Sequence, residues 1–398
     1  MIAELAGNYF VRLLFGTDEV DVNLSSIKMF SIIQDMDRFL PSIQLRFADT
    51  MGTITHMIPF DNKMKKIRVE LGFSSKEVVS NGFDFCVYRR KPESNFSSAV
   101  DYEIVGLLDV DNLFIPRKTR SFSDQIKNTL ETIATDELAC TKTDIGASLN
   151  YSKTLIQANW SNSTFLSDLK SRLIGRAGEY AYKIFIKMID KERYLVCKSI
   201  KEFYESDIKY RFYIGDKIYK DGKSANVIYP IYDYSIIDNS VLCNRKQAYT
   251  YFDYTTSTQV SSEEEYGDFF SLTERFLIDG NDCEASHKFS DYGRNNEFTS
   301  TFEENTKAKY FDRLSKLSNM WILSVGLPNI SPGDIVQIIF NQGITSGNLL
   351  SYQYSGYWMV RRAVHIIGET FKTRLLLSRN GVDTDQDTTL CEAVSNKR

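Results

Sequence analysis

The sequence predicts a β-rich α+β fold whose first and last parts are built from short strands. Aromatic residues are abundant, with 26 Phe, 23 Tyr and 3 Trp among 398 residues, and such side chains favour the half-buried surface of a sheet. Segments near both ends alternate apolar and polar residues, as half-buried strands do. Helical spacing is confined to segments between these ends. This length suits two to four domains.

The first 120 residues contain five predicted strands. They are 8–15, 42–48, 65–73, 81–90 and 102–110. In 65–73 the apolar residues fall on alternate positions, starting at Ile67, and Arg68 and Glu70 fall between them. The segment 24–40 has clustered apolar residues and is compatible with either a strand or a helix.

The middle of the chain predicts a smaller α/β domain. After Pro116, apolar residues recur at helical spacing from Ile126 to Ile133, with Ser121 or Ser123 as the N-cap. A second helix is predicted over 162–180 from Leu166, Leu169 and Leu173. The segments 180–190 and 192–200 then predict a hairpin that turns at Asp190-Lys191.

An acidic, tyrosine-rich stretch follows this middle part. Between Ser261 and Glu304 there are 12 acidic and 3 basic residues, a local charge of −9. A solvated surface excursion is the ordinary interpretation of such a run, and a cation-binding face is the alternative. The segment 261–276 is compatible with the start of a charged helix.

The last part returns to strands after a helix predicted over 301–318. Strands are predicted at 320–327 and before 340, with a turn at 331–334 between them. A closing hairpin is predicted from 357–367 and 371–379, with Gly368-Glu369 at the turn. Strict alternation would place Trp358, Val360 and Arg362 on one face and Arg361 and His365 on the other. A loose tail is expected over 381–398.

Charge and cysteine usage narrow the class of protein. The net charge is −4 and the isoelectric point is near 5.7, which argues against a protein that grips nucleic acid through a basic face. Six cysteines are scattered without metal-finger or CxxC spacing, which predicts buried thiols in a reducing compartment. The N-terminus lacks the pattern of a signal peptide, and no apolar run reaches the roughly 18 residues of a membrane span. A soluble protein made in a cytoplasm is expected.

No catalytic, cofactor or metal motif stands out. Nucleotide-binding, metalloprotease and nucleophile-elbow patterns do not occur. The three histidines, His56, His287 and His365, are isolated in sequence, so neither a multi-histidine metal site nor a histidine-assisted nucleophile is predicted. "DVDN" at 109–112 and "DGND" at 279–282 begin like calcium loops but lack the required glycine and glutamate. Carboxylates are plentiful, but no pair is singled out for glycoside hydrolysis. The prediction is a non-enzymatic protein with no catalytic, cofactor-binding or metal residues.

Several segments, taken in order, resemble a known family. They are "PSIQLRFADTMG", "PRKTRSFSDQIKNTLETIA", the α-β-β segment 161–200, and "NISPGDIVQIIF … YSGYWMVRRAVHIIGETFKTRLLLSRNGVD". In order and spacing they resemble the central baseplate hub proteins of contractile-tailed bacteriophages, which have relatives in contractile injection systems. The acidic stretch has no clear counterpart there, so its role is open.

The resemblance implies two similar antiparallel β-barrel domains. It divides the chain into a first barrel at 1–120, a helix plus α-β-β domain at 121–215, an acidic insertion at 216–300 that contributes strands to the second barrel, and a helix with the second barrel at 301–380.

The function that the resemblance implies is structural. A homotrimer would form a pseudo-sixfold ring that adapts a trimeric spike to the sixfold tail tube and lines the DNA channel. Its partners would be itself, the spike, tube or tube-initiator proteins and baseplate wedge components. DNA would pass without specific binding. Its place would be the virion tail, assembled in the host cytoplasm. The alternatives are a tail-associated cell-wall hydrolase and a receptor- or sugar-binding tail protein.

Overall fold

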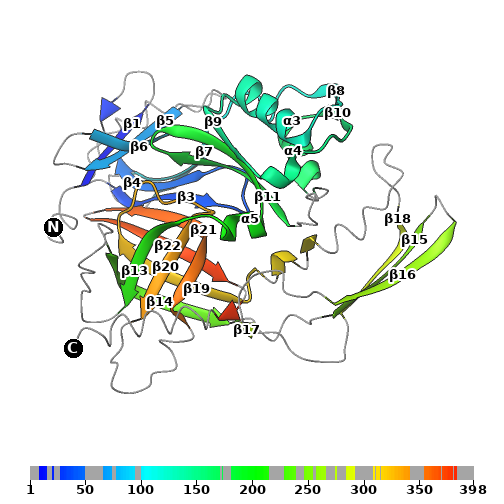
Figure 1. Ribbon diagram of the computed structural model, residues 1–398. Coiled ribbons are helices and arrows are strands. Elements are labelled where there is room, and N and C mark those ends of the chain that lie inside the picture. The colour runs from blue at the N-terminus through cyan, green and yellow to red at the C-terminus, as the bar shows by residue number, and fades with distance from the viewer. Residues whose placement is uncertain are drawn as a thin grey trace, which may run out of the picture.

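The computed structural model is dominated by one continuous 13-stranded sheet (Figure 1). It describes residues 9–15, 20–21, 27–49, 66–73, 78–94, 100–170, 173, 181–214, 228–238, 246–253, 257–265, 274–275, 284–291, 308–309, 311–313, 315–340, 354–368, 370–379 and 381–382. The β-rich fold class is confirmed, with one closed six-stranded barrel among the described strands. No helix in this described part is long and apolar enough to cross a bilayer.

The first half of the sheet comes from the first 110 residues. In spatial order its main strands are β1 (Tyr9–Phe15), β5 (Lys66–Phe73), β6 (Val78–Ser94), β7 (Val100–Leu108), β4 (Ser42–Asp49) and β3 (Ile27–Asp35), and the short β2 (Val20–Asp21) lies beyond β1. All of these pairings are antiparallel. The predicted strands are therefore present, and the ambiguous segment 24–40 contains a strand. Alternate residues such as Ile67, Val69 and Leu71 are fully buried, so the period-two pattern marks the core face.

The second half of the sheet closes into a six-stranded barrel. Its strands are β13 (Ile208–Ile214), β14 (Ile228–Asp238), β19 (Ser318–Val325), β22 (Phe371–Arg379), β21 (Gly356–Ile367) and β20 (Ile335–Phe340). The pairing of β21 with β22 closes the ring. The pairings are antiparallel except that β13 runs parallel to both β14 and β20. Of these strands β13 lies before residue 216, β14 lies within 216–300, and the other four come after residue 300.

The two halves are joined by backbone pairing. Residues 362–366 of β21 pair with residues 31–35 of β3, while the start of β21 pairs with β20. One strand thus belongs to the closed barrel at one end and to the seam with the first sheet at the other. Figure 1 shows the two sheets stacked, with the seam strands between them.

The middle part packs against the first sheet. β8 (Lys118–Phe122) pairs with β10 (Leu155–Trp160). The helix α3 (Ile126–Thr132) continues into a π-helical turn over Ile133–Glu137, and α4 (Asn162–Lys170) follows β10. The hairpin of β11 (Tyr182–Ile189) and β12 (Glu192–Ser199) leads into α5 (Ile200–Tyr204), and the parallel strand β9 (Lys142–Ile145) borders it.

The turn at Asp190-Lys191 is confirmed, because both residues have positive φ. The predicted N-cap of the first helix is wrong. The backbone of Ser121 is committed to the ladder between β8 and β10, so the helix starts after Gln125.

The segment 216–300 also contains a small sheet of its own. β15 (Lys246–Asp253) pairs with β16 (Thr258–Glu265) and with β18 (Glu284–Asp291), and Figure 1 shows this sheet apart from the main body. The helix start suggested for 261–276 is wrong over 261–265, which pair as a strand. Of the helix predicted over 301–318, only 308–309 and 311–313 are described as helical, and β19 already begins at Ser318. The tail beyond 382, residue 56 and the segment 279–282 lie outside the described residues.

Candidate functional site: the charged junction and the cleft

His365 is a core residue of the seam. Its side chain is fully buried, packs beside the Phe371 ring at 5.8 Å, and has its Nδ1 3.4 Å from the Thr373 hydroxyl. Burial lowers its pKa to about 4, so the ring is neutral at neutral pH. A catalytic base must reach substrate, and this imidazole has no exposed surface. His365 therefore forms part of the wall between the two sheets. His287 lies in β18, far from it in the sequence.

A β-bulge at Arg361, in the same strand as His365, changes the predicted alternation of this strand. Val360 pairs with Leu377 and Arg362 with Leu376, so Arg361 is an extra residue without an opposite partner. Trp358, Val360 and then Ala363 all face the barrel core. The expectation that Arg362 shares a face with Trp358 and Val360 is wrong for this reason, because one inserted residue moves the later side chains to the other face.

The bulge directs Arg361, whose side chain is buried, into a partly exposed charged cluster, which we call the charged junction. Its Nη2 lies 2.9 Å from Asp37 and 3.3 Å from Asp312, and its Nη1 donates to the Ser315 hydroxyl at 3.0 Å. Lys183 from β11 also reaches Asp37, at 2.5 Å, and Asp312, at 2.6 Å. Asp37 follows the first-sheet strand β3, and Asp312 precedes β19. The charged junction thus connects the first sheet, the middle part and the closed barrel.

The electrostatics of the charged junction favour ionised carboxylates. Burial alone would raise the pKa of Asp312, but Lys183, Arg361 and Lys316 lower it to about 2. The same cations hold the pKa of Asp37 far below its usual range, against an opposing effect of burial. Lys316 completes the set at 2.7 Å from Asp312. The ion pairs are therefore intact at every physiological pH, which suits a permanent structural connection.

Asn81 makes a second connection between the same three parts. Its buried amide nitrogen donates to the backbone oxygens of Met188, at 3.1 Å, and Pro328, at 3.0 Å. Its oxygen accepts from the backbone nitrogens of Gly82, at 2.9 Å, and Lys191, at 3.3 Å. The side chain of Asn81 in β6 therefore hydrogen-bonds both to the β11–β12 hairpin and to the turn between β19 and β20, and so connects them. A fully satisfied buried amide fixes geometry, because any shift leaves a buried polar group unpaired.

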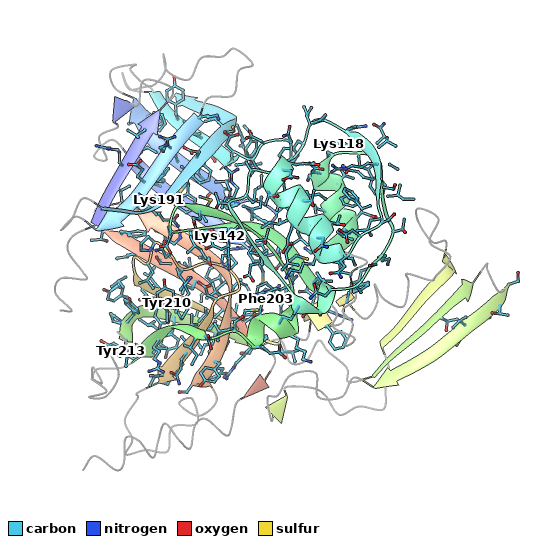
Figure 2. All side chains as sticks on the ribbon, turned by 45° about the horizontal axis from the view of Figure 1, so that its top comes forward. Lys118, Lys142, Lys191, Phe203, Tyr210 and Tyr213 are labelled. Atoms are coloured by element: carbon cyan, nitrogen blue, oxygen red, sulfur yellow. The ribbon has the colours of Figure 1, made fainter. Side chains whose placement is uncertain are left out.

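Aromatic packing at α5 closes the contact between the middle part and the barrel. Phe203, labelled in Figure 2, stacks on Phe185 with the ring centroids 6.2 Å apart. It also lies against Gly333, whose φ of 87° is available to glycine at little cost. The carboxylate of Asp334 accepts from the Ser331 backbone nitrogen at 2.8 Å, which fixes the predicted turn.

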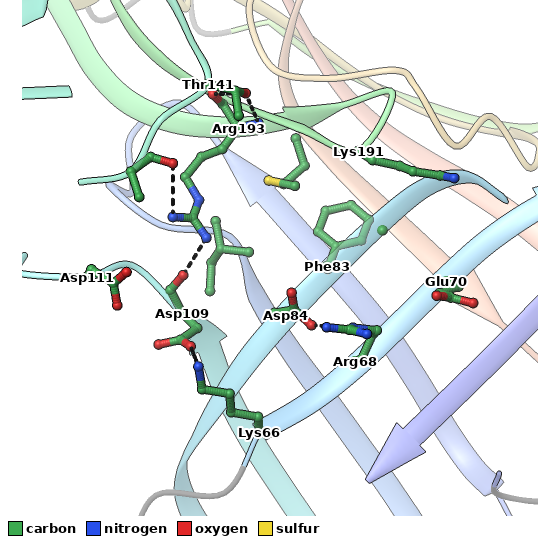
Figure 3. Close-up of a pocket in the computed structure, with 14 residues that line it drawn as sticks. Lys66, Arg68, Glu70, Phe83, Asp84, Asp109, Asp111, Thr141, Lys191 and Arg193 are labelled. Atoms are coloured by element: carbon green, nitrogen blue, oxygen red, sulfur yellow. Dashed lines mark hydrogen bonds and ion pairs between the residues drawn. The ribbon is translucent and has the colours of Figure 1, made fainter. Parts of the chain in front are cut away.

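A cleft of about 490 Å³ lies between the first sheet and the β11–β12 hairpin (Figure 3). Four of its charged side chains pair with one another. Lys66 lies 2.6 Å from Asp109, and Arg68 donates to Asp84 at 2.8 Å. Arg193 donates to the backbone oxygen of Asp109 at 2.7 Å. Asp109, the first residue of the "DVDN" segment, is thus held as part of an ion pair.

Asp109 in this cleft lacks the raised pKa that a general acid of hydrolysis requires. A general acid needs a carboxyl with a raised pKa. The pKa of Asp109 is lowered instead, since the Cys86 thiol and Lys66 more than offset its burial. Among the described residues, no group of three or more His, Cys, Asp or Glu side chains is placed to hold a metal ion.

Comparison with solved structures identifies the fold. A tail protein from Neisseria meningitidis MC58 matches with a TM-score of 0.55 and 9% identity, over 95% of this chain and 98% of its own. The 43 kDa tail protein of prophage MuSo2 from Shewanella oneidensis matches with a TM-score of 0.58 and 10% identity, over 94% of this chain and all of its own.

The chain therefore has the fold of these two tail proteins. A type VI secretion component from E. coli, described as similar to the T4 tail proteins gp27 and gp5, matches with a lower TM-score of 0.48 and 7% identity, over 93% of this chain and 76% of its own. No protein-family model and no curated protein sequence matches the chain.

Sequence reasoning missed the residues that join the parts of this tail-protein fold. Arg361 was assigned to a strand face, and Asn81 and Asp37 carried no signal. Two adjacent arginines in an apolar strand, Arg361-Arg362, were the only available hint, because a buried strand seldom tolerates two consecutive charges.

Proposed function

We propose that this protein is the structural hub of a phage-tail baseplate. Three copies form a ring in which the first sheet and the closed barrel alternate, giving six similar units around a central channel. This ring joins a trimeric spike on one side to a sixfold tail tube on the other. The protein works in the virion tail, after assembly in the host cytoplasm, together with spike, tube or tube-initiator and baseplate wedge proteins.

The observation that carries this proposal is the continuous sheet that unites the two halves of one chain. The β3–β21 pairing, the charged junction and Asn81 fix the two halves relative to each other. If each of three chains contributes two similar units held rigidly together, the ring has six similar units and matches a sixfold partner. The fold shared with two tail proteins, one of them from a prophage, supports the proposal of a tail component.

The net negative charge of the chain supports a channel through which DNA passes without being bound. The chain carries a net charge of −4. A wall that DNA slides past must not neutralise its phosphates, because each such contact adds affinity. Several described cations are held in ion pairs within the chain, among them Arg361, Lys183 and Lys66, and these are not available to hold a passing duplex.

The hydrolase and receptor-binding alternatives have less support. The described cleft holds carboxylates in ion pairs, and His365 is buried. No feature of the described residues favours a sugar-binding groove over a protein contact.

Mass measurement and particle imaging test the proposal. Purified protein is examined by native mass spectrometry and negative-stain electron microscopy, alone and with its candidate spike. Three chains of 45.8 kDa give a particle of about 137 kDa with a central hole. A compact monomer that stays alone when spike is added, at the highest concentration at which it is soluble, would refute the hub function.

A further inference from the structure

Two tyrosines project from the molecule at β-bulges in the interior of a sheet. Tyr88 lies between Val87 and Arg89, where the pairing of β6 with β7 shifts by one residue. Tyr232 lies between Ile231 and Asp233, at the same kind of shift between β14 and β19. The two side chains are 54% and 53% exposed. A bulge re-aims side chains, so both tyrosines have been turned away from the cores that their neighbours fill.

An exposed charge stands beside each tyrosine, and the two charges are opposite. Arg89 follows Tyr88 and Asp233 follows Tyr232, and both are exposed. Within the described part of the chain neither is engaged in an ion pair. Ile237, which is 50% exposed, adds apolar surface on β14. Aromatic anchors with adjacent charges are typical of protein–protein contacts, where the aromatic supplies buried area and the charge sets register.

The two surfaces lie in different halves of the molecule. β6 belongs to the first sheet and β14 to the closed barrel, near the top and the bottom of the view in Figure 1. They cannot form one patch on a single chain. One surface is basic and aromatic, the other acidic and aromatic, so each offers what the other lacks. A contact between unlike surfaces of identical chains is heterologous, and such contacts close into rings when the rotation permits.

We propose that the Tyr88–Arg89 surface of one copy binds the Tyr232–Asp233 surface of the next. This inference rests on the ring proposed above and names the surfaces that close it. The occupant of each surface is a second copy of this chain, because one contact then accounts for both bulges, both exposed tyrosines and the opposite charges. The tyrosines pack in the centre of the contact, and Arg89 pairs with Asp233 across it.

Charge reversal and its rescue test the contact. The single variants Asp233→Arg and Arg89→Asp each place like charges across it, and the double variant restores opposite charges with the order exchanged. Asp207→Arg and Arg117→Asp are matched controls, because both residues are exposed and make no ion pair with described residues. Circular dichroism confirms folding, and mass photometry over a dilution series measures the trimer fraction.

Each single reversal is expected to raise the trimer dissociation midpoint at least about tenfold, and the double variant to recover most of that loss. The control variants should dissociate like the wild type. Trimers whose midpoint shifts no more in the reversals than in the controls would overturn the contact while leaving the ring intact. Reversals that abolish spike binding but leave the trimer whole would also overturn it, because the surfaces would then face the spike. A wild-type protein that is monomeric at its solubility limit would overturn both proposals.

Discussion

Replacing Arg361 by methionine removes the central cation of the charged junction while keeping most of the volume of its apolar stem. The side chain is 3% exposed and reaches two carboxylates and one hydroxyl. Removing one partner of a buried ion pair typically costs about 3–5 kcal/mol. Here Lys183 and Lys316 still neutralise Asp37 and Asp312, and the Asp37 side chain is 39% exposed. We therefore expect a loss of about 2–3 kcal/mol in the free energy of unfolding.

Urea denaturation followed by circular dichroism, at one protein concentration, measures this loss. A fixed concentration is needed because self-association would add to the apparent stability. The matched control is Arg374→Met on the neighbouring strand. Arg374 is exposed and lies 4.8 Å from the Trp321 ring, an interaction worth about 0.5–1 kcal/mol. If Arg361→Met costs no more than Arg374→Met, the charged junction does not hold the two halves together.

The same variant predicts a change in acid sensitivity. The pKa of Asp312 is about 2 in the folded protein, against an ordinary value of 3.8, and that of Asp37 is lower still. Depressed carboxyl pKa values stabilise the fold above about pH 4, and this contribution is lost as the pH falls towards 2. The wild type should lose more stability over this window than Arg361→Met does. Parallel pH profiles would contradict the assigned electrostatics.

Three further predictions concern single core residues. As the pH falls from 6.5 to about 4, only the unfolded chain protonates His365, so the wild type should lose up to about 3 kcal/mol of unfolding free energy. His365→Leu should remove this loss. Equal slopes of unfolding free energy against pH in the wild type and the variant, from denaturation at several pH values, would refute this. Gly106→Ala should cost about 1–3 kcal/mol, since a Cβ there would come within 2.8 Å of a core methyl group. Gly368→Ala is the control, because a Cβ there would have no neighbouring atom within 4 Å, and its stability should be nearly unchanged. Thermal melts measure both variants, and similar melting temperatures for Gly106→Ala and Gly368→Ala would contradict the packing. Asn81→Ala should lower the free energy of unfolding by about 2–4 kcal/mol, because it leaves buried backbone groups unpaired. Asn319→Ala, which loses one hydrogen bond, should lower it by about 1 kcal/mol or less. Equal losses of unfolding free energy in urea denaturation would show that Asn81 does not connect the parts of the fold.

Many strands of both halves could be predicted because their information is local, although β13 and β14 were not among them. Alternation in 66–73 and in 371–379 matches the buried positions, since a strand that covers a core must place apolar side chains every second residue. The hairpin turn at Asp190-Lys191 and the turn before Asp334 carry their own chemistry. These elements follow from neighbouring residues alone, so the sequence predicts them without knowledge of the fold.

The contacts that join the two halves could not be predicted, because the residues that make them are far apart in the chain. Arg361 meets Asp37 across 324 positions, and Asn81 meets Pro328 across 247. A β-bulge also leaves no signal in the sequence, since nothing in "MVRRAV" shows which arginine is the extra residue.

By itself, the sequence determined a β-rich chain with strand-rich ends, an α/β middle and no recognisable catalytic motif. Only the tertiary structure decided that β21 closes one barrel while pairing with the other sheet, and that three bulges aim Arg361 inward and Tyr88 and Tyr232 outward. The physical reason is that alternation specifies which face of a strand is apolar, whereas strand partners and bulges are set by long-range backbone pairing and packing.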